Sequence, residues 1–226
     1  MLTKKTWYVL VLVVGLTCWV YGEPGQGKDA AAQAQPLFNG KDFTGWVRFL
    51  PDANVDADTV WQVKDGVIHC TGTPTGYLRT EQPYGDYRLE LEWRWVEKPG
   101  NSGVLLHITG DDKVWPKSIE AQLKSDNAGD FYVIEGTDFK EHVNKDDRRV
   151  PKKMESNEKP IGEWNKMEIE CKGDTIKVYV NGVLQNEATE TSVVKGMIGL
   201  QSEGAPIEFR NIVLKPLPSS VRRVEK

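Results

Sequence analysis

One short segment places polar side chains at every second position. In the predicted strand Ser118–Lys124 successive side chains point to opposite faces, so one face is apolar and the other consists of Ser118, Glu120, Gln122 and Lys124. A polar row of this kind on a central strand is unusual unless the face is wet or functional. Glu120 is the first candidate for a catalytic acid or base, because a carboxyl group among apolar walls or other acids holds its proton more tightly and can protonate a leaving oxygen.

The neighbouring predicted strands supply candidates for a second group, one that activates water. His107 falls on the same side as Asn101 in one strand, and Glu92 and Arg94 are a comparable polar pair in the strand before it. His107 or Glu92 is the candidate second catalytic group. We therefore expect a cleft, closed in part by the irregular segment Thr137–Lys159, that is lined by Glu92, Arg94, Asn101, His107, Glu120, Gln122 and Lys124.

Each of these residues also has a purely structural interpretation. Glu120 and Gln122 could be solvated, outward residues of an exposed sheet. Glu92 and Arg94 could form a cross-strand ion pair worth under about 1 kcal/mol. A turn followed by close backbone packing at Gly103 would explain the segment around that glycine equally well.

The chain after Pro36 has the pattern of many short strands. Apolar and polar side chains alternate most clearly from Tyr87 to Trp95, and no stretch of a dozen residues keeps helical spacing. Asp65-Gly66 and Asn181-Gly182 are signals for two-residue hairpin turns, since glycine accepts the positive φ that such turns require. Further strands are predicted at Trp61–Val63, Val67–Cys70, Gly76–Thr80, Gly103–Thr109, Ser118–Lys124, Asp130–Ile134, Lys166–Lys172, Thr175–Val180, Val183–Ala188, Gly196–Gln201 and Ile207–Leu217. Strands this short and numerous predict an all-β, antiparallel two-sheet jelly-roll sandwich.

Composition fits a soluble globular protein, and length fits one large β domain or two small ones, so the strand pattern has to decide between them. Of the 226 residues, 39% are hydrophobic and 27% are charged, which allows a sizeable core. We divide the chain into a signal peptide (1–22), a spacer (23–35), one β-sandwich domain (36–217) and a C-terminal tail (218–226).

The N-terminal segment predicts export to the periplasm or the extracellular space. Lys4 and Lys5 precede an apolar run that is too short to span a bilayer comfortably, and small residues follow it. An uncleaved N-terminal anchor is one alternative, in which case the membrane would be contacted through this segment alone. A lipoprotein attached through Cys18 is another.

Other partners and cofactors find little support in the sequence. The net charge of -4, with no long basic run outside the extreme C-terminus, argues against nucleic acid, and there is no phosphate-binding loop or nucleophile elbow. The three histidines form no ligand cluster in the sequence, so no cofactor is predicted, although the aspartates near 111, 126 and 146 leave a structural calcium ion as an alternative. Cys70 and Cys171 could be two buried thiols or a disulfide.

Nine motifs, in family order, resemble the 3-keto-disaccharide hydrolase domain family. They run through residues 36–217 as LFNGKDFTGW (37–46), WQVKDG (61–66), YGDY (84–87), NSGV (101–104), EAQL (120–123), GEWN (162–165), VNG (180–182), GLQ (199–201) and FRNI (209–212). The resemblance implies a concanavalin A-like sandwich related to lectins and glucanases, exported by bacteria. It also implies hydrolysis of glycosidic bonds in 3-keto-disaccharides or 3-keto-glucosides.

The resemblance places carbohydrate on one sheet face and suggests roles there. Arg94 and Lys124 would polarise a keto oxygen or orient hydroxyl groups, and Asn101 and Gln122 would contact the sugar. Trp115, in the connection before the Ser118–Lys124 strand, would stack on a sugar ring at the rim of the cleft. A 3-keto group acidifies the C2 hydrogen, so elimination followed by hydration is open beside direct hydrolysis. Position 107, where the family more often has arginine, departs from the pattern.

Two functions of other classes stay open at this point. The first is a non-catalytic, carbohydrate-binding lectin-like module. The second is an interaction domain that contacts a protein partner through the Thr137–Lys159 segment. Loss of turnover with retained binding in Glu120→Gln would favour the enzyme, and failure to bind any sugar would favour the interaction domain.

Overall fold

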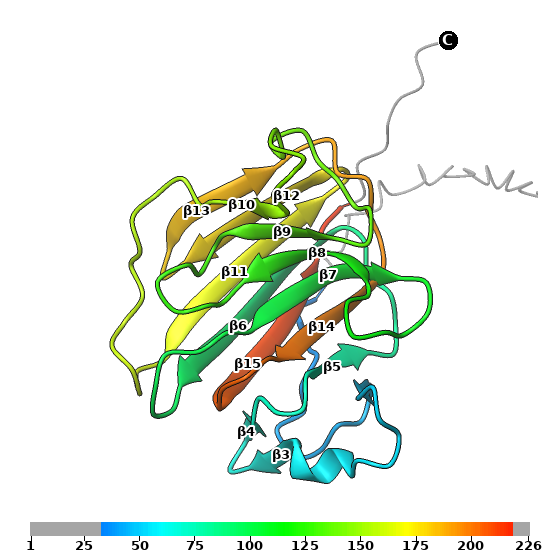
Figure 1. The fold of residues 1–226 in the computed structure, drawn as a ribbon, viewed down its shortest axis with the longest axis vertical. Coiled ribbons are helices and arrows are strands. Elements are labelled where there is room, and N and C mark those ends of the chain that lie inside the picture. Colours follow the sequence, from blue (N-terminus) through cyan, green and yellow to red (C-terminus); the bar gives the residue numbers. More distant parts are fainter. Residues whose placement is uncertain (1–32, 219–226) are drawn as a thin grey trace, which may run out of the picture. The chain divides into compact units, whose positions relative to one another are not determined.

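Two antiparallel sheets stacked face to face form the fold of residues 33–218, the part of the chain that this computed structural model describes (Figure 1). The eight-stranded sheet has the order β13-β12-β11-β6-β15-β4-β3, with β1 paired to β15, and the seven-stranded sheet has the order β10-β9-β8-β7-β14-β5-β2. The strands of the eight-stranded sheet are β1 (Gln35–Pro36), β3 (Trp61–Lys64), β4 (Val67–Cys70), β6 (Tyr87–Trp95), β11 (Asn165–Lys172), β12 (Thr175–Val180), β13 (Val183–Ala188) and β15 (Ile207–Pro216). Those of the seven-stranded sheet are β2 (Trp46–Phe49), β5 (Gly76–Thr80), β7 (Gly103–Thr109), β8 (Lys117–Gln122), β9 (Phe131–Ile134), β10 (Arg149–Val150) and β14 (Met197–Ser202).

Strand β6 shows why the two sheets stack. Its side chains at odd positions, from Tyr87 to Trp95, are buried, while the charged side chains at even positions stay partly exposed. The buried side chains share one apolar core with residues of the other sheet, among them Ile119 on β8 and Leu200 on β14. Burying apolar surface contributes about 25 cal/mol per Å², so the alternating pattern holds the sheets together.

The predicted fold class is confirmed, and so is every strand predicted from the pattern, with bounds that differ by at most two residues. Three short edge elements, β1, β2 and β10, were not predicted from the sequence. The only helical element of residues 33–218 is one 3-10 turn at Ala57–Thr59. Both predicted hairpin turns have positive φ at their two central residues, 50° and 77° at Asp65-Gly66 and 46° and 82° at Asn181-Gly182.

Strand β7 contains an irregularity that the period-two argument did not foresee. Its pairing with β8 shifts register between Leu106 and Thr109, and His107 there has φ 56°. The backbone of Gly196 lies so close that an added Cβ would be 2.4 Å from the His107 carbonyl carbon. An irregular residue re-aims the side chains that follow it, so the face assigned to His107 by simple alternation does not hold.

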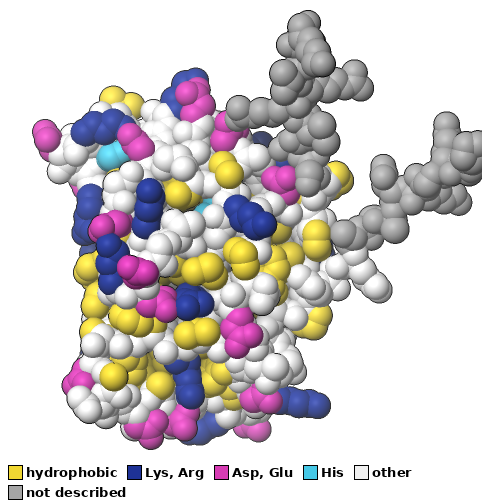
Figure 2. Space-filling view, turned by 90° about the vertical axis from the view of Figure 1, so that its right-hand side faces the viewer, with side chains coloured by type: hydrophobic (Ala, Val, Ile, Leu, Met, Phe, Trp, Pro, Cys, Tyr) yellow, Lys and Arg dark blue, Asp and Glu magenta, His cyan; other side chains and the backbone are white. Residues whose placement is uncertain are grey.

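The surface of residues 33–218 carries mixed charge on the face in Figure 2, and the two cysteines of this range are buried. Lysine and arginine are interspersed with aspartate and glutamate on the face shown in Figure 2, with no large area of one sign. Cys70 and Cys171 are both buried and free. No helix within residues 33–218 is long and apolar enough to cross a membrane. The predicted signal peptide and most of the spacer and tail lie outside the described residues.

Candidate active site

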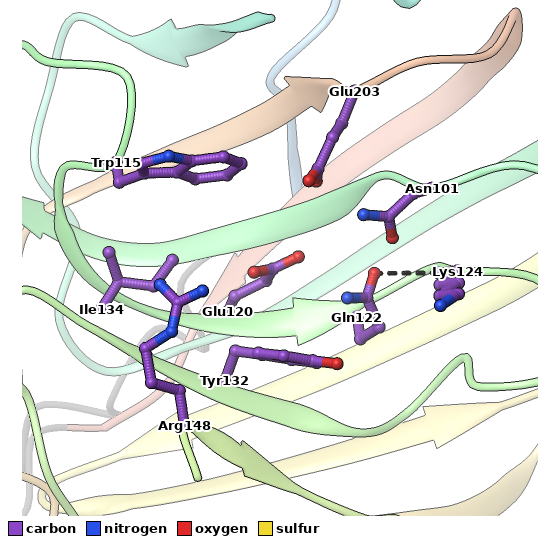
Figure 3. A pocket seen from close by; sticks show the side chains of 9 residues that line it. All are labelled: Asn101, Trp115, Glu120, Gln122, Lys124, Tyr132, Ile134, Arg148 and Glu203. Atoms are coloured by element: carbon purple, nitrogen blue, oxygen red, sulfur yellow. Dashed lines mark hydrogen bonds between the residues drawn. The ribbon is translucent and has the colours of Figure 1, made fainter. Parts of the chain in front are cut away.

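A pocket of about 220 Å³ opens on the face of the seven-stranded sheet that is turned away from the other sheet. On β8, Ile119 and Ala121 belong to the core between the sheets, so Glu120 and Gln122 must face the opposite way. Figure 3 shows the nine residues that line the pocket: Asn101, Trp115, Glu120, Gln122, Lys124, Tyr132, Ile134, Arg148 and Glu203. Five of the eight predicted site residues are therefore brought together here, namely Asn101, Trp115, Glu120, Gln122 and Lys124.

Glu120 lies on the floor of the pocket and is only 4% exposed. Its carboxyl group lies over the backbone of β7, because a Cβ on Gly103 would be 2.1 Å from Glu120 Oε1. That oxygen has no hydrogen-bond partner among the described residues. Burial, followed by the nearby charge of Glu203, raises the pKa of Glu120 from its ordinary value of 4.5 to about 8, although Arg148 opposes the shift.

A second carboxyl group, Glu203, points toward Glu120 across the pocket (Figure 3). It directly follows β14 and is held by bridge pairing of Asn101 with Glu203 and Gly204. Burial raises the pKa of Glu203 above its ordinary value of 4.5, although the Asn101 side-chain amide and the cations Arg148 and Lys124 oppose the rise. The pocket thus holds two carboxyl groups whose pKa values are both raised, and the charge of Glu203 disfavours ionisation of Glu120.

Two cations line the same pocket without an ion pair to any described residue. Lys124 follows β8, where Gln122 Oε1 accepts hydrogen bonds of 2.9 Å from the backbone N–H groups of Leu123 and Lys124. Arg148 precedes β10, and its carbonyl oxygen accepts a hydrogen bond from Val133 N–H. Unpaired cations facing buried carboxyl groups can bind negative charge that develops in a substrate.

An anchored loop places the aromatic wall of the pocket. Asp112 accepts hydrogen bonds from Tyr77 Oη at 2.7 Å and from Arg79 Nε and Nη2, each at 2.7 Å. Both partners belong to β5 of the seven-stranded sheet, so the connection between β7 and β8 is fixed to the sheet before it reaches Trp115. Trp115 is 38% exposed and, with Ile134, provides an apolar side to an otherwise polar pocket.

Glu92 and Arg94 do not belong to this pocket, so the predicted lining is wrong at both positions. They lie on β6 in the eight-stranded sheet, and the outer face of that sheet carries ion pairs between strands. Glu92 Oε2 pairs with Arg210 Nε at 2.5 Å, and Arg94 Nε pairs with Glu208 Oε2 at 2.5 Å. The cross-strand ion-pair interpretation describes them, with partners on β15 rather than with each other.

His107 is also wrongly placed by the predicted lining. Its side chain is fully buried, packs edge-on against Tyr87 of the other sheet and interacts through Nδ1 with the Val193 carbonyl oxygen at 3.1 Å. Burial lowers its pKa. The irregularity in β7 turns this ring into the interior between the sheets, so His107 is a core residue.

Four lining residues were not predicted from the sequence: Tyr132, Ile134, Arg148 and Glu203. A signal for Tyr132 and Ile134 was present, because they alternate on the predicted strand Asp130–Ile134. Arg148 lies within the segment expected to close the cleft, and it is the part of that segment that reaches the pocket. No local pattern marks Glu203, which comes after the end of its strand.

A metal site does not emerge from the side chains of residues 33–218. No group of three or more histidine, cysteine, aspartate or glutamate residues in this range could hold a metal ion. Of the aspartates considered for calcium, Asp112 has both carboxylate oxygens engaged by Arg79.

The two-sheet sandwich has the fold of the concanavalin A-like lectins and glucanases. A β-glucanase of Bacillus licheniformis has this fold, with a TM-score of 0.52 and 16% identity over 84% of this chain and 100% of that chain. The family described as the 3-keto-alpha-glucoside-1,2-lyase-like domain matches residues 33–215, and the chain belongs to this family.

Two further relatives share most of the chain. A protein named 3-keto-disaccharide hydrolase from Bacteroides thetaiotaomicron is 26% identical over 230 residues, which cover 80% of this chain and 77% of the relative. A crystal structure of a candidate glycosyl hydrolase from Parabacteroides distasonis is similar with a TM-score of 0.62 and 25% identity, covering 82% of this chain and 100% of that chain.

Proposed function

We propose that this protein is a glycoside hydrolase-type enzyme that cleaves the glycosidic bond of a disaccharide or glucoside oxidised at C3. The observation that carries the proposal is Glu120, a buried carboxyl group with a pKa of about 8 that faces a second carboxyl group in a sheet-face pocket. The family and the named hydrolase relative support the keto sugar as the substrate class.

The size of the pocket suits a single sugar ring. At about 220 Å³ it is smaller than the roughly 300–1,000 Å³ of sites for drug-sized ligands. Trp115 offers a flat apolar surface for the ring, and the carboxyl, amide and cationic groups offer partners for its oxygens. The oxidised ring would occupy the pocket, and the leaving group would extend along the sheet.

The two carboxyl groups divide the acid and base roles. A pKa of about 8 keeps Glu120 largely protonated at pH 7, so it donates its proton to the leaving oxygen. Glu203 is more exposed to solvent than Glu120, and Asn101, Arg148 and Lys124 oppose the rise in pKa that burial causes, so it acts as the base. Different environments that push two pKa values apart are the usual way in which a pair of carboxyl groups takes two roles.

An elimination followed by hydration is the route that this arrangement favours. Glu203 takes the proton from C2, the C2–H electron pair forms the C1=C2 bond, and the C1–O bond breaks as the leaving oxygen takes the Glu120 proton. The C3 oxygen carries the negative charge that develops, and Arg148 or Lys124 stabilises it. Water then adds at C1 and C2 regains a proton, which gives the free keto sugar.

The route is tested by turnover of 3-keto-glucosides in D₂O. Elimination with hydration places deuterium at C2 of the product, elimination alone stops at the unsaturated keto sugar, and direct hydrolysis retains hydrogen at C2. The free product incubated in D₂O without enzyme is the control for spontaneous exchange. Binding without turnover of any keto or unoxidised sugar would contradict the enzyme and favour a carbohydrate-binding module.

The roles are tested by comparing Glu120→Gln with Glu203→Gln. Loss of the acid slows a substrate with a poor alkoxide leaving group far more than one with a nitrophenolate leaving group, because the latter needs no protonation. Loss of the base slows both substrates to the same degree. Equal effects of the two variants on the two substrates would contradict the assignment.

We also propose that the protein is exported by a bacterium through its N-terminal segment and acts in the periplasm or outside the cell. The charged, apolar and small-residue order of residues 1–22 supports this. Cell fractionation and N-terminal sequencing of the mature protein test it, and a cytoplasmic protein that retains Met1 would contradict it.

A further inference from the structure

Gln201 on β14 is a buried side chain whose polar atoms have nothing to bind. It is 2% exposed, and neither Oε1 nor Nε2 has a hydrogen-bond partner among the described residues. Its backbone is satisfied, since its carbonyl oxygen accepts a hydrogen bond of 2.9 Å from Ser102 Oγ. The hydroxyl of Ser202, the next residue, donates to the Pro74 carbonyl oxygen at 2.8 Å. Of the side-chain and carbonyl groups just described on Gln201 and Ser202, the Gln201 amide is therefore the one that lacks a partner.

The register of the sheet places this amide on the face that carries the pocket. Leu200 belongs to the core between the sheets, so Gln201, one position along, faces the opposite way. Glu203, two residues after Gln201 in the chain, lines the pocket. Across the strands, Leu200 pairs with Val104, which brings Gln201 next to Gly103 on β7.

Glu120 leans toward the same place. Its carboxyl group lies directly over Gly103, although its own cross-strand partner on β7 is Leu105. Gly103 lies between Gln122 on β8 and Gln201 on β14. Glu120 Oε1 and Asn101 Oδ1, both of lining residues, are also buried and without a partner. Unpaired polar atoms from β8, from β14 and from the residue two positions before β7 thus lie on this face of the sheet around Gly103.

A buried amide without partners lowers the stability of the folded protein, because its desolvation is uncompensated. A ligand that forms the missing hydrogen bonds would account for a residue that lowers stability in its absence. A sugar hydroxyl is both a donor and an acceptor, so it can pair with the amide oxygen and the amide nitrogen alike.

We propose that Gln201 is a substrate-binding residue of this site, and that its side-chain amide hydrogen-bonds a ring hydroxyl of the sugar held at Glu120. The inference rests on the proposed function for the identity of the ligand as a sugar. Gln201 would then contact the sugar from behind the residues that line the pocket. The GLQ motif at 199–201, which has no part in the acid–base steps, would bind substrate.

The first test is Gln201→Met, which keeps the length of the side chain and removes its hydrogen bonds. We expect a melting temperature equal to or higher than that of the wild type, together with at least a tenfold fall in kcat/KM for the 3-keto-glucoside. Gln185→Met is the matched control, because Gln185 is a buried amide on β13 of the other sheet whose Nε2 donates to Asn157 Oδ1 at 2.8 Å, while only its Oε1 lacks a partner. It should lower the melting temperature and leave kcat/KM unchanged.

The second test identifies the hydroxyl with substrates that lack oxygen at C2, C4 or C6. For one of them the wild type should lose activity, while Gln201→Met should lose no more than it has already lost, because the two changes remove the same hydrogen bond. Penalties that add for all three sugars, or a variant that loses stability without losing kcat/KM, would overturn the proposal.

Failure of the proposed function has a different signature. If the wild type binds the keto sugar without cleaving it, calorimetric affinity replaces kcat/KM, and the same tenfold loss in Gln201→Met is expected. If the wild type binds no sugar at all, the proposed function and this inference are both overturned.

Discussion

Replacing Glu120 with glutamine should change how the stability of the protein depends on pH. The folded state holds the proton of Glu120 up to a pKa of about 8, whereas the unfolded chain releases it near 4.5. Between these values the unfolded state binds fewer protons, so the free energy of unfolding falls as pH rises. The stabilising contribution is complete below pH 4.5 and is lost by the time pH has passed 8.

The size of the effect follows from the two pKa values. One pKa unit corresponds to about 1.4 kcal/mol, so Glu120 alone lowers the free energy of unfolding by about 5 kcal/mol between pH 4 and pH 9. Glu120→Gln has no such titration. The difference in stability between variant and wild type should therefore shift by about 5 kcal/mol in favour of the variant over this range.

Urea unfolding of both proteins at pH 4, 6, 7.5 and 9 measures this difference. Other groups that titrate in both proteins largely cancel, apart from the interaction of Glu120 with Glu203, which belongs to the effect. The glutamine amide adds a constant offset that does not depend on pH. A difference that stays flat from pH 4 to pH 9 would show that Glu120 is ionised in the folded protein and would refute its role as the acid.

Three further predictions concern the groups around the pocket. Gly103→Ala should cut kcat/KM by more than a hundredfold with a small loss of stability, because the new Cβ displaces the flexible Glu120 side chain rather than backbone; wild-type turnover would contradict this. Asp112→Asn should raise KM about tenfold, because it frees the loop that carries Trp115. In a protein that already has Trp115→Ala, adding Asp112→Asn should not raise KM further. An equal rise in KM with and without Trp115 would show that Asp112 does not act through Trp115. His107 has a pKa below 6.5 in the folded protein, so stability is lost as pH falls below 6.5, and His107→Leu should lose less stability than wild type between pH 6.5 and 5 in thermal unfolding; parallel curves would contradict this.

Alternation along a single strand is a local property, so the sequence alone predicts which side chains share a face. Glu120 and Gln122 were placed on one face because side chains of a strand alternate regardless of what the strand pairs with. Asp65-Gly66 marked a turn because positive φ is a demand of the turn itself. The motifs gave the family, which the match to residues 33–215 shows.

Only the tertiary structure decided which polar rows meet. Glu92 lies on a polar row as regular as that of Glu120, yet its strand belongs to the other sheet. Local alternation cannot predict this, because strand order depends on pairing between segments distant in the chain. His107 turned inward at an irregularity that is set by the close approach of Gly196, almost ninety positions later. Glu203 and Arg148 joined Glu120 from different strand ends, so the charges that perturb its pKa come from contacts that no local pattern contains.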